Sequence, residues 1–185
     1  MPFDPNAYGR EIRDILELDG GGERLIPLVA DRCSSEAARE RLLKQKPLTL
    51  FPNAPAPEAA LAGLWLYFSC FEESHSIAQD IAGGEGSFWH AILHRQEPDS
   101  GNSAYWFRRV GTHAIFPALL DTAREIVERY PEAEFRFGPQ WDPFAFIMFC
   151  ERARQQPGSA SERAALEIQR AEWQLLFDYC ARPRT

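Results

Sequence analysis

The chain is poor in lysine, in paired cysteine motifs and in long apolar segments. Lys44 and Lys46 are its only lysines, no run of basic residues occurs, and the net charge over 185 residues is −7. Binding to nucleic acid or to an anionic membrane surface needs a basic face, so the composition argues against both classes of partner. The longest apolar segment, near 61–71, is too short and too soon followed by charge to span a bilayer.

Cysteine is also sparse. The four cysteines are Cys33, Cys70, Cys150 and Cys180, and none of them stands in a C-x-x-C pair. Because three of the four lie in apolar helical patterns, the sequence favours buried free thiols over disulfides or a metal site. The first residues lack the basic region and apolar stretch of a secretion signal, so we expect a cytoplasmic protein.

Helical periodicity dominates what is present. Apolar residues recur at helical spacing between clear stop signals, and they predict helices over 8–18, 23–31, 36–46, 57–81, 87–95, 100–110, 117–130, 143–155 and 161–180. Alternation at 134–137 allows one minor extended piece. We therefore predict an all-α fold, a single-domain irregular bundle of about seven or eight helices over residues 1–185.

The chemistry-bearing residues are concentrated in the segment 72–113. All four histidines fall there, and acids and arginines are crowded around them: His75, His90, His94, His113, Glu72, Asp80, Glu97, Asp99, Arg95, Arg108 and Arg109. If 57–81 is one helix, His75 continues its apolar stripe and faces inward, where an unpaired imidazole would cost about 1–3 kcal/mol. His90 and His94 lie four apart, on the flank of an apolar arc.

A metal site is the first interpretation of this segment. His90 and His94 can reach one ion from one helical face, Glu72 and His75 have the i, i+3 spacing of metal-binding bundles, and His113 could complete the set. The glutamate of an H-E-x-x-H motif is absent, since Ala91 stands in its place. A divalent transition metal is thus one possibility, and a satisfied buried His75 with two partly exposed histidines is the other.

Anion binding and proton transfer are further interpretations. Arg95, Arg108 or Arg109 could hold a carboxylate or phosphate, with hydrogen bonds from Asn102 and Tyr105. Trp89 and Trp106 would form aromatic walls, whereas Arg–carboxylate pairs that merely lock helices are the plain alternative. His75 could also act as a general base if Asp80 or Glu72 orients its ring. The sequence has no G-x-S-x-G motif, and its glycines at 83, 84 and 86 lack the preceding strand of a nucleotide-binding loop.

Four stretches of the chain resemble a family of uncharacterised proteins: residues 74–79, 89–99, 105–111 and 172–178, which read SHSIAQ, WHAILHRQEPD, YWFRRVG and EWQLLFD. The resemblance covers the central third and the C-terminal helix. It implies that the histidine-rich segment is the hallmark of the family, and it implies no catalytic role, because the family has no established activity.

We therefore expect a small-molecule-binding protein whose polar pocket takes an anionic or polyhydroxylated ligand, with catalysis an open question. The candidate residues are His75, His90 and His94 for catalysis, Arg95, Asn102, Tyr105, Arg108 and Arg109 for ligand binding, and His90 and His94 for metal. The alternative is a helical interaction or structural module in which the same residues form a buried ion-pair network. Substrate, reaction and oligomeric state are left open by the sequence.

Overall fold

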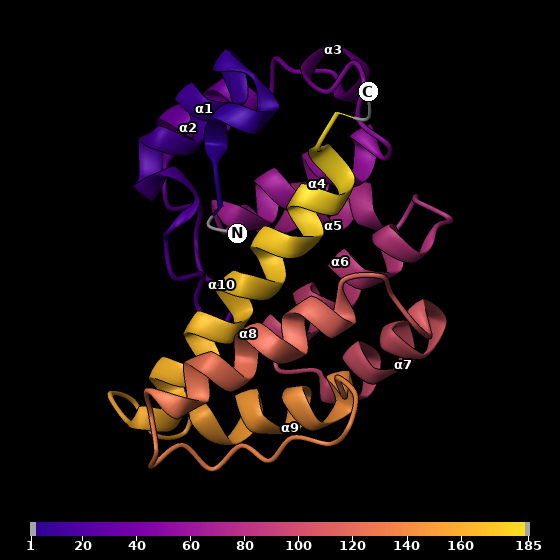
Figure 1. The fold of residues 1–185 in the computed structure, drawn as a ribbon. Helices are drawn as coiled ribbons and strands as arrows, with labels where there is room; N and C mark the ends of the chain where they lie inside the picture. Colours follow the sequence, from indigo (N-terminus) through magenta and orange to yellow (C-terminus); the bar gives the residue numbers. More distant parts are fainter. Residues whose placement is uncertain (1–2, 184–185) are drawn as a thin grey trace.

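The computed structural model describes residues 3–183, and within this range the fold is all-α with no strand. Figure 1 shows short helices of the N-terminal third packed at one end and longer helices below them. The helices are α1 (Arg10–Leu16), α2 (Glu36–Leu42), α3 (Pro47–Leu50), α4 (Pro57–Tyr67), α5 (Phe71–Ala78), α6 (Gly84–Gln96), α7 (Ser100–Val110), α8 (Phe116–Glu128), α9 (Pro143–Ala153) and α10 (Ala160–Ala181), with 3-10 helices η1 (Pro5–Tyr8) and η2 (Glu17–Gly22). The predicted class is confirmed, with a few more helices than expected.

The last helix, α10, runs along the whole molecule and joins two apolar cores (Figure 1). Its first half packs with α8 and α9 through Ala164, Ala165 and Ile168. Its second half packs with α4 through Trp173 and Phe177, and the Trp173 indole N–H donates to the carbonyl of Gly63 at 2.7 Å. A helix with apolar contacts along its full length is the element around which the others are placed.

Several predicted helix ends are confirmed by the capping contacts. The side chains of Ser35, Asp99 and Asp142 each accept hydrogen bonds from the first turn of α2, α7 and α9. These contacts satisfy backbone N–H groups that have no partner within the helix. Gly111 ends α7 with a φ of 64°, a conformation that favours glycine. Local sequence signals are therefore sufficient to place these boundaries.

The prediction of one helix over 57–81 is wrong. The chain breaks between α4 and α5 at Ser69, which has a φ of 57°. Two contacts from a distant segment hold the break: the Ser34 N–H donates to the carbonyl of Phe68 at 2.7 Å, and Cys33 forms a disulfide with Cys70. The expectation that all four cysteines are free is thus wrong for this pair, whereas Cys150 and Cys180 are free and buried. Because the break resets the helical phase, His75 is only half-buried.

The predicted helix over 23–31 is also absent, and the segment is irregular. Its backbone is held by side chains of other elements. The Gln169 amide donates to the carbonyls of Ile26 and Pro27, at 2.8 and 3.0 Å, and the Gln96 amide donates to Pro27 at 2.8 Å. Pro27 itself disfavours a helix interior. The segment 134–137, expected to be extended, is likewise assigned no strand.

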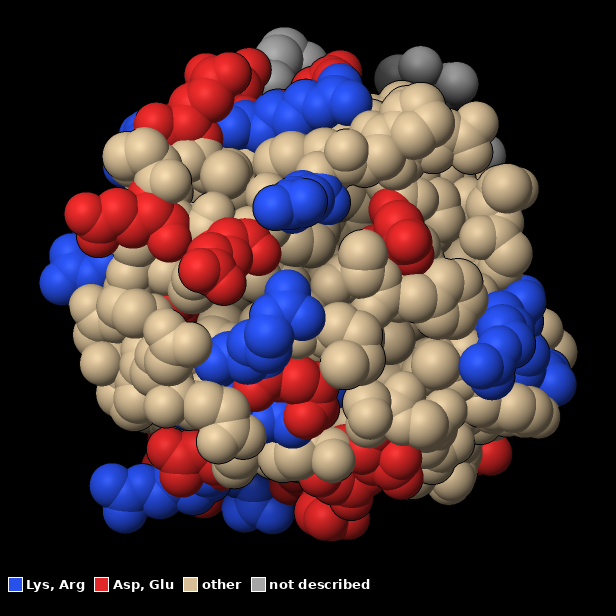
Figure 2. All heavy atoms as spheres, turned by 90° about the horizontal axis from the view of Figure 1, so that it is seen from below, with Lys and Arg blue, Asp and Glu red and all other residues tan. Residues whose placement is uncertain are grey.

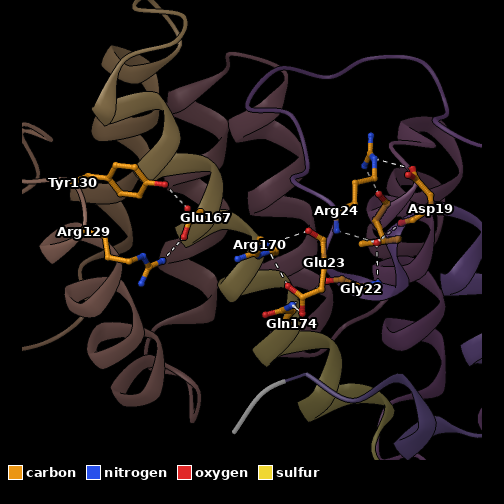
Figure 3. Close-up of polar contacts among 10 residues, drawn as sticks. Asp19, Gly22, Glu23, Arg24, Arg129, Tyr130, Glu167, Arg170 and Gln174 are labelled. Atoms are coloured by element: carbon orange, nitrogen blue, oxygen red, sulfur yellow. Dashed lines mark hydrogen bonds and ion pairs between the residues drawn. The ribbon is translucent and has the colours of Figure 1, made fainter.

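Polar contacts tie α10 both to the residues that follow α8 and to the segment around η2, as Figure 3 shows. Glu167 accepts hydrogen bonds from Tyr130 and Arg129 at the end of α8. Towards the N-terminal region, Arg170 pairs with Glu23, and the Gln174 amide donates to the carbonyl of Gly22. These contacts fix the register of α10 against both cores.

Surface charge is mixed on the face viewed in Figure 2, which is the lower side of Figure 1, where α9 and the segment before it lie. Acidic and basic side chains are interspersed there and separated by broad uncharged areas. No extended patch of one sign appears on that face. None of the helices in 3–183 has both the length and the apolar character needed to cross a membrane.

Candidate functional site

Three consecutive helices build the candidate site. His75 comes from α5, His90 and His94 come from α6, and α7 lies across α6. Two buried serines hold these helices: Ser74 ties α5 to α4 by donating to the carbonyl of Ala62 at 2.8 Å, and Ser103 ties α7 to α6 by donating to the carbonyl of Ala91 at 2.7 Å. A side-chain hydroxyl bonded to a neighbouring helix backbone fixes both the spacing and the register of the two helices.

Close approach of α4 to α6 keeps α6 in the interior. A Cβ atom built on Gly63 would lie 2.7 Å from the Trp89 ring, so only glycine allows this contact. All residues from 86 to 96 are buried, and His90 and His94 are 4% and 7% exposed. The two histidines were predicted on the flank of the apolar arc of this helix. Neighbouring helices cover that side of α6, so it is not open to solvent.

The three imidazoles of His75, His90 and His94 form one group, here called the histidine cluster. Each ring offers a nitrogen, and these nitrogens lie within 4.8 Å of one another. The Nε2 atoms of His75 and His90 are 2.9 Å apart. The His90 and His94 rings are stacked with centroids 4.8 Å apart, and His75 meets both edge-on. Such a group needs either shared protons or a bound cation to satisfy its lone pairs.

Neighbouring polar side chains orient His94. Its Nδ1 lies 2.8 Å from a carboxylate oxygen of Glu97, so Nδ1–H donates to Glu97 and the lone pair is at Nε2. The Asn102 amide nitrogen lies 3.1 Å from that Nε2. A carboxylate that holds the far nitrogen of an imidazole is the usual outer partner of a histidine that binds metal.

His90 is the most buried member of the cluster. Burial, followed by the neighbouring charges of His75 and His94, lowers the pKa of His90 to about 4. Its Nδ1 is buried with no hydrogen-bond partner among the described residues. A neutral ring at pH 7 is the form that binds metal or accepts a proton.

Aromatic rings line the cluster on two sides. Trp106 of α7 is stacked on His90 with centroids 4.1 Å apart, and Phe71 of α5 is stacked on His75 at 5.8 Å. The Arg109 guanidinium lies over Trp106 at 5.1 Å, and Tyr105, which is exposed, meets Trp106 edge-on. Of the expected ligand-binding residues, Asn102, Tyr105 and Arg109 are thus near the cluster, and Phe71 is a neighbour that the sequence did not single out.

Other candidates lie elsewhere. Arg95 is completely buried, pairs with Glu172 and Gln169 of α10, and lies 4.6 Å from the Phe146 ring centroid. Arg108 lies over Phe144 of α9 instead. Three further candidates contribute no ligand atom to the histidine cluster: His113, Glu72 and Asp80.

The side chains of His94 and Arg95 differ in direction because consecutive residues of a helix point about 100° apart. Trp89, expected as a wall, faces Gly63 in the core. The sequence could not reveal these directions, because they depend on which helix covers each side of α6.

A second group of possible metal ligands lies at the start of α5 and consists of Cys33, Cys70 and Glu73. The two sulfurs are joined as a disulfide, and Glu73 is paired with Arg39 at 2.7 Å. Both arrangements already satisfy the groups concerned. We therefore treat this region as a structural clamp that fixes the beginning of the helix carrying His75.

No protein-family model, curated protein or solved structure matches this chain. The geometry of the site is therefore the basis for a function. The convergence of three histidines from two helices is its most specific feature.

Proposed function

We propose that the protein binds a divalent transition metal ion, with zinc as the first candidate, through His75, His90 and His94. The observation that carries this proposal is the convergence of their ring nitrogens within 4.8 Å, with two of them at 2.9 Å. Zinc–nitrogen bonds of about 2.0–2.1 Å in a tetrahedral site place ligand nitrogens about 3.3 Å apart. The 2.9 Å pair lies below that spacing and the 4.8 Å limit lies above it, so the rings have to rotate when an ion binds.

The donor set supports zinc over harder ions. Three neutral imidazoles suit zinc, copper, nickel or iron, whereas calcium and magnesium prefer oxygen ligands. Burial keeps His90 neutral, and Glu97 presents the lone pair of His94 at Nε2. Three protein ligands leave a fourth position for water or a ligand, as in catalytic rather than structural zinc sites.

The surrounding side chains support binding of a small anionic or polyhydroxylated molecule at this position. The Asn102 amide, the exposed Tyr105 and the Arg109 guanidinium lie on α7 beside the cluster. Amide and phenol groups bind hydroxyls, and a guanidinium binds carboxylate or phosphate. A bound zinc ion would supply Lewis acidity there, so metal-assisted hydrolysis is the reaction class we propose for an enzymatic role.

A structural role without metal is the competing proposal, and two contacts favour it. The His75 and His90 rings can share one N–H···N hydrogen bond, and Asn102 already donates to His94. In that case, the cluster simply joins α5, α6 and α7. Arg95 is part of the kind of buried ion-pair network that this proposal requires.

Metal titration distinguishes the two proposals. Protein purified without an affinity tag is treated with a chelator and titrated with zinc in a calorimeter. We expect one ion per chain, and at least a hundred-fold loss of affinity in His94→Gln. The matched control is His113→Gln, which removes the one histidine outside the cluster and leaves zinc binding unchanged. Absence of zinc, copper, nickel and iron binding to the folded wild-type protein would leave the structural role.

The cytoplasmic location is also retained as a proposal. The Cys33–Cys70 disulfide argues against this location, because disulfides are uncommon in reducing compartments. Mass spectrometry after alkylation of intact cells gives the redox state directly. Alkylation of both Cys33 and Cys70 is expected for a cytoplasmic protein, whereas a fully oxidised pair would contradict that location.

A further inference from the structure

The disulfide between Cys33 and Cys70 lies in an open groove of the surface. The groove has a volume of about 700 Å³ and is lined by the irregular segment 30–33, the start of α5 and one side of α2. Cys33 is half-buried within an otherwise exposed segment, 29–34, whereas Cys70 is buried at the start of α5. A dithiol reductant therefore reaches the Cys33 sulfur from the groove.

Reduction by such a dithiol takes two steps. One thiolate of the reductant bonds to the Cys33 sulfur, the bond between Cys33 and Cys70 breaks, and Cys70 leaves as a thiol. The second thiol of the reductant then bonds to the first, which releases Cys33 as a thiol and leaves the reductant as a cyclic disulfide. Two electrons and two protons pass to the protein. Dithiol proteins keep thiols reduced in the cytoplasm, which is the location retained above as a proposal.

The two thiols stay close together after reduction, because other contacts hold the backbone on both sides of Cys33. The Ala30 N–H donates to the carbonyl of Gln96 at 2.8 Å. The Ser34 N–H donates to the carbonyl of Phe68 at 2.7 Å. Neither hydrogen bond involves a sulfur atom, so both survive when the disulfide opens.

Glu73 supplies a third ligand beside the two sulfurs. It follows Cys70 by three residues and therefore lies on the same side of the first turn of α5. One carboxylate oxygen of Glu73 and the sulfurs of Cys33 and Cys70 all lie within 4.8 Å of one another. Arg39 donates to Oε1 of Glu73 at 2.7 Å. A carboxylate has two oxygens, so one binds an ion while Arg39 orients the group through the other.

The charge of the groove favours a cation. Five acids line it against two arginines: Asp31, Glu36, Glu72, Glu73 and Glu97, and Arg32 and Arg39. A concave surface with an excess of negative charge raises the local concentration of cations. The guanidinium of Arg39 is shared between Glu73 and Glu36, which lies 3.4 Å from it.

We infer that the reduced pair Cys33 and Cys70, together with Glu73, binds a zinc ion. Thiolates favour zinc over calcium or magnesium, and each thiol loses its proton to solvent when the ion binds. Zinc–sulfur bonds of about 2.3 Å place two sulfurs about 3.8 Å apart in a tetrahedral site, so the segment 29–34 moves outward on binding. The ion then takes over the task of the disulfide, which is to join this segment to the start of α5. No ligand comes from the histidine cluster, so this site is independent of the proposed function.

Cadmium is the probe, because cadmium–thiolate bonds give an ultraviolet charge-transfer absorption that histidine ligands do not give. The full chain is reduced with a phosphine, freed of it without exposure to air, and titrated with cadmium. We expect the absorption to saturate at one ion per chain, and zinc to displace it. The oxidised protein should give no such absorption. His94→Gln, which disables the histidine cluster, should leave the absorption unchanged, so the two sites are tested separately.

Matched variants test the carboxylate ligand. Glu73→Gln should lower the cadmium affinity of the reduced protein by about ten-fold or more. Glu36→Gln is the control, because Glu36 lines the same groove and pairs with the same arginine but lies outside the converging group. The control should lower the affinity less than about three-fold, as expected for loss of an exposed charge.

Alkylation followed by mass spectrometry shows that the reduced chain remains folded. Cys33 and Cys70 should react in the metal-free protein and be protected by zinc, whereas the buried thiols of Cys150 and Cys180 should not react in either state. The inference is overturned if the reduced protein gives no thiolate absorption with cadmium, or if the two glutamate variants lose affinity equally. Reaction of all four cysteines also overturns it, since the chain would then unfold on reduction.

Discussion

Two neighbouring residues of α6, His94 and Arg95, belong to opposite kinds of polar interior. Arg95 has an anion, an amide and an aromatic face arranged around it, all from α9 and α10. The histidine cluster has three ionisable rings facing one another, and its one carboxylate, Glu97, contacts only His94. The first region satisfies its charge within the protein. The second has capacity left for a proton or a cation, which is the physical distinction between a structural network and a candidate site.

Removal of one partner from the buried ion pair should have the largest effect. Glu172→Gln leaves the Arg95 charge buried without its anion, and we expect a loss of about 3–5 kcal/mol in the free energy of unfolding. Urea denaturation measures it. The control is Glu11→Gln, which breaks an exposed pair with Arg41 and should cost less than about 1 kcal/mol. Equal losses in the two variants would contradict the assignment of Arg95 to a tightly paired interior.

Loss of the disulfide should affect the cluster and spare the ion pair. Cys33→Ser opens a link across 37 residues, and we expect a loss of about 2–4 kcal/mol in the free energy of unfolding. Because the disulfide fixes the beginning of α5, zinc affinity through His75 should also decrease. Cys180→Ser, at a buried free thiol, is the matched control for cysteine replacement and should retain zinc affinity. Unchanged stability after Cys33→Ser would show that the disulfide does not form.

The outer partner of His94 gives a smaller and more specific effect. Glu97→Gln removes the carboxylate that holds Nδ1, and we expect zinc affinity to decrease about 10- to 100-fold with little change in stability. Calorimetric titration gives the affinity, and thermal melting gives the stability. Glu73→Gln, which breaks the pair between α5 and Arg39 of α2, serves as the control. An equal loss of zinc affinity in both variants would point to general electrostatics.

The pH dependence of stability should be the most gradual difference. The pKa of His90 is lowered to about 4 in the folded protein, whereas an unfolded histidine titrates near 6.5. The unfolded chain therefore binds more protons between these values, and stability decreases as pH falls from about 6.5 towards 4, by at most about 1.4 kcal/mol per pH unit. In metal-free protein, His90→Gln should flatten this part of the urea-denaturation profile. An unchanged slope would assign the dependence to other groups.

The segment that holds the histidine cluster could be predicted from the sequence, but the geometry of the cluster could not. Spacing indicated that His90 and His94 share a side of one helix, and the structure places them in a stack. His75 was expected beside them on the inward face of one helix over 57–81, whereas that helix breaks at Ser69 and His75 is only half-buried. The break depends on Cys33 and Ser34, which are distant in sequence, and no local pattern reports such a contact.

The amino-acid sequence by itself determined the helical class, most helix boundaries and the concentration of titratable groups in 72–113. These follow from local forces, namely apolar periodicity, capping side chains and prolines. Only the tertiary structure decided that His94 faces two other imidazoles while Arg95 faces Glu172. The physical reason is that a helix offers every side to packing, and the neighbours that arrive from distant parts of the chain determine which side chains pair and which remain available.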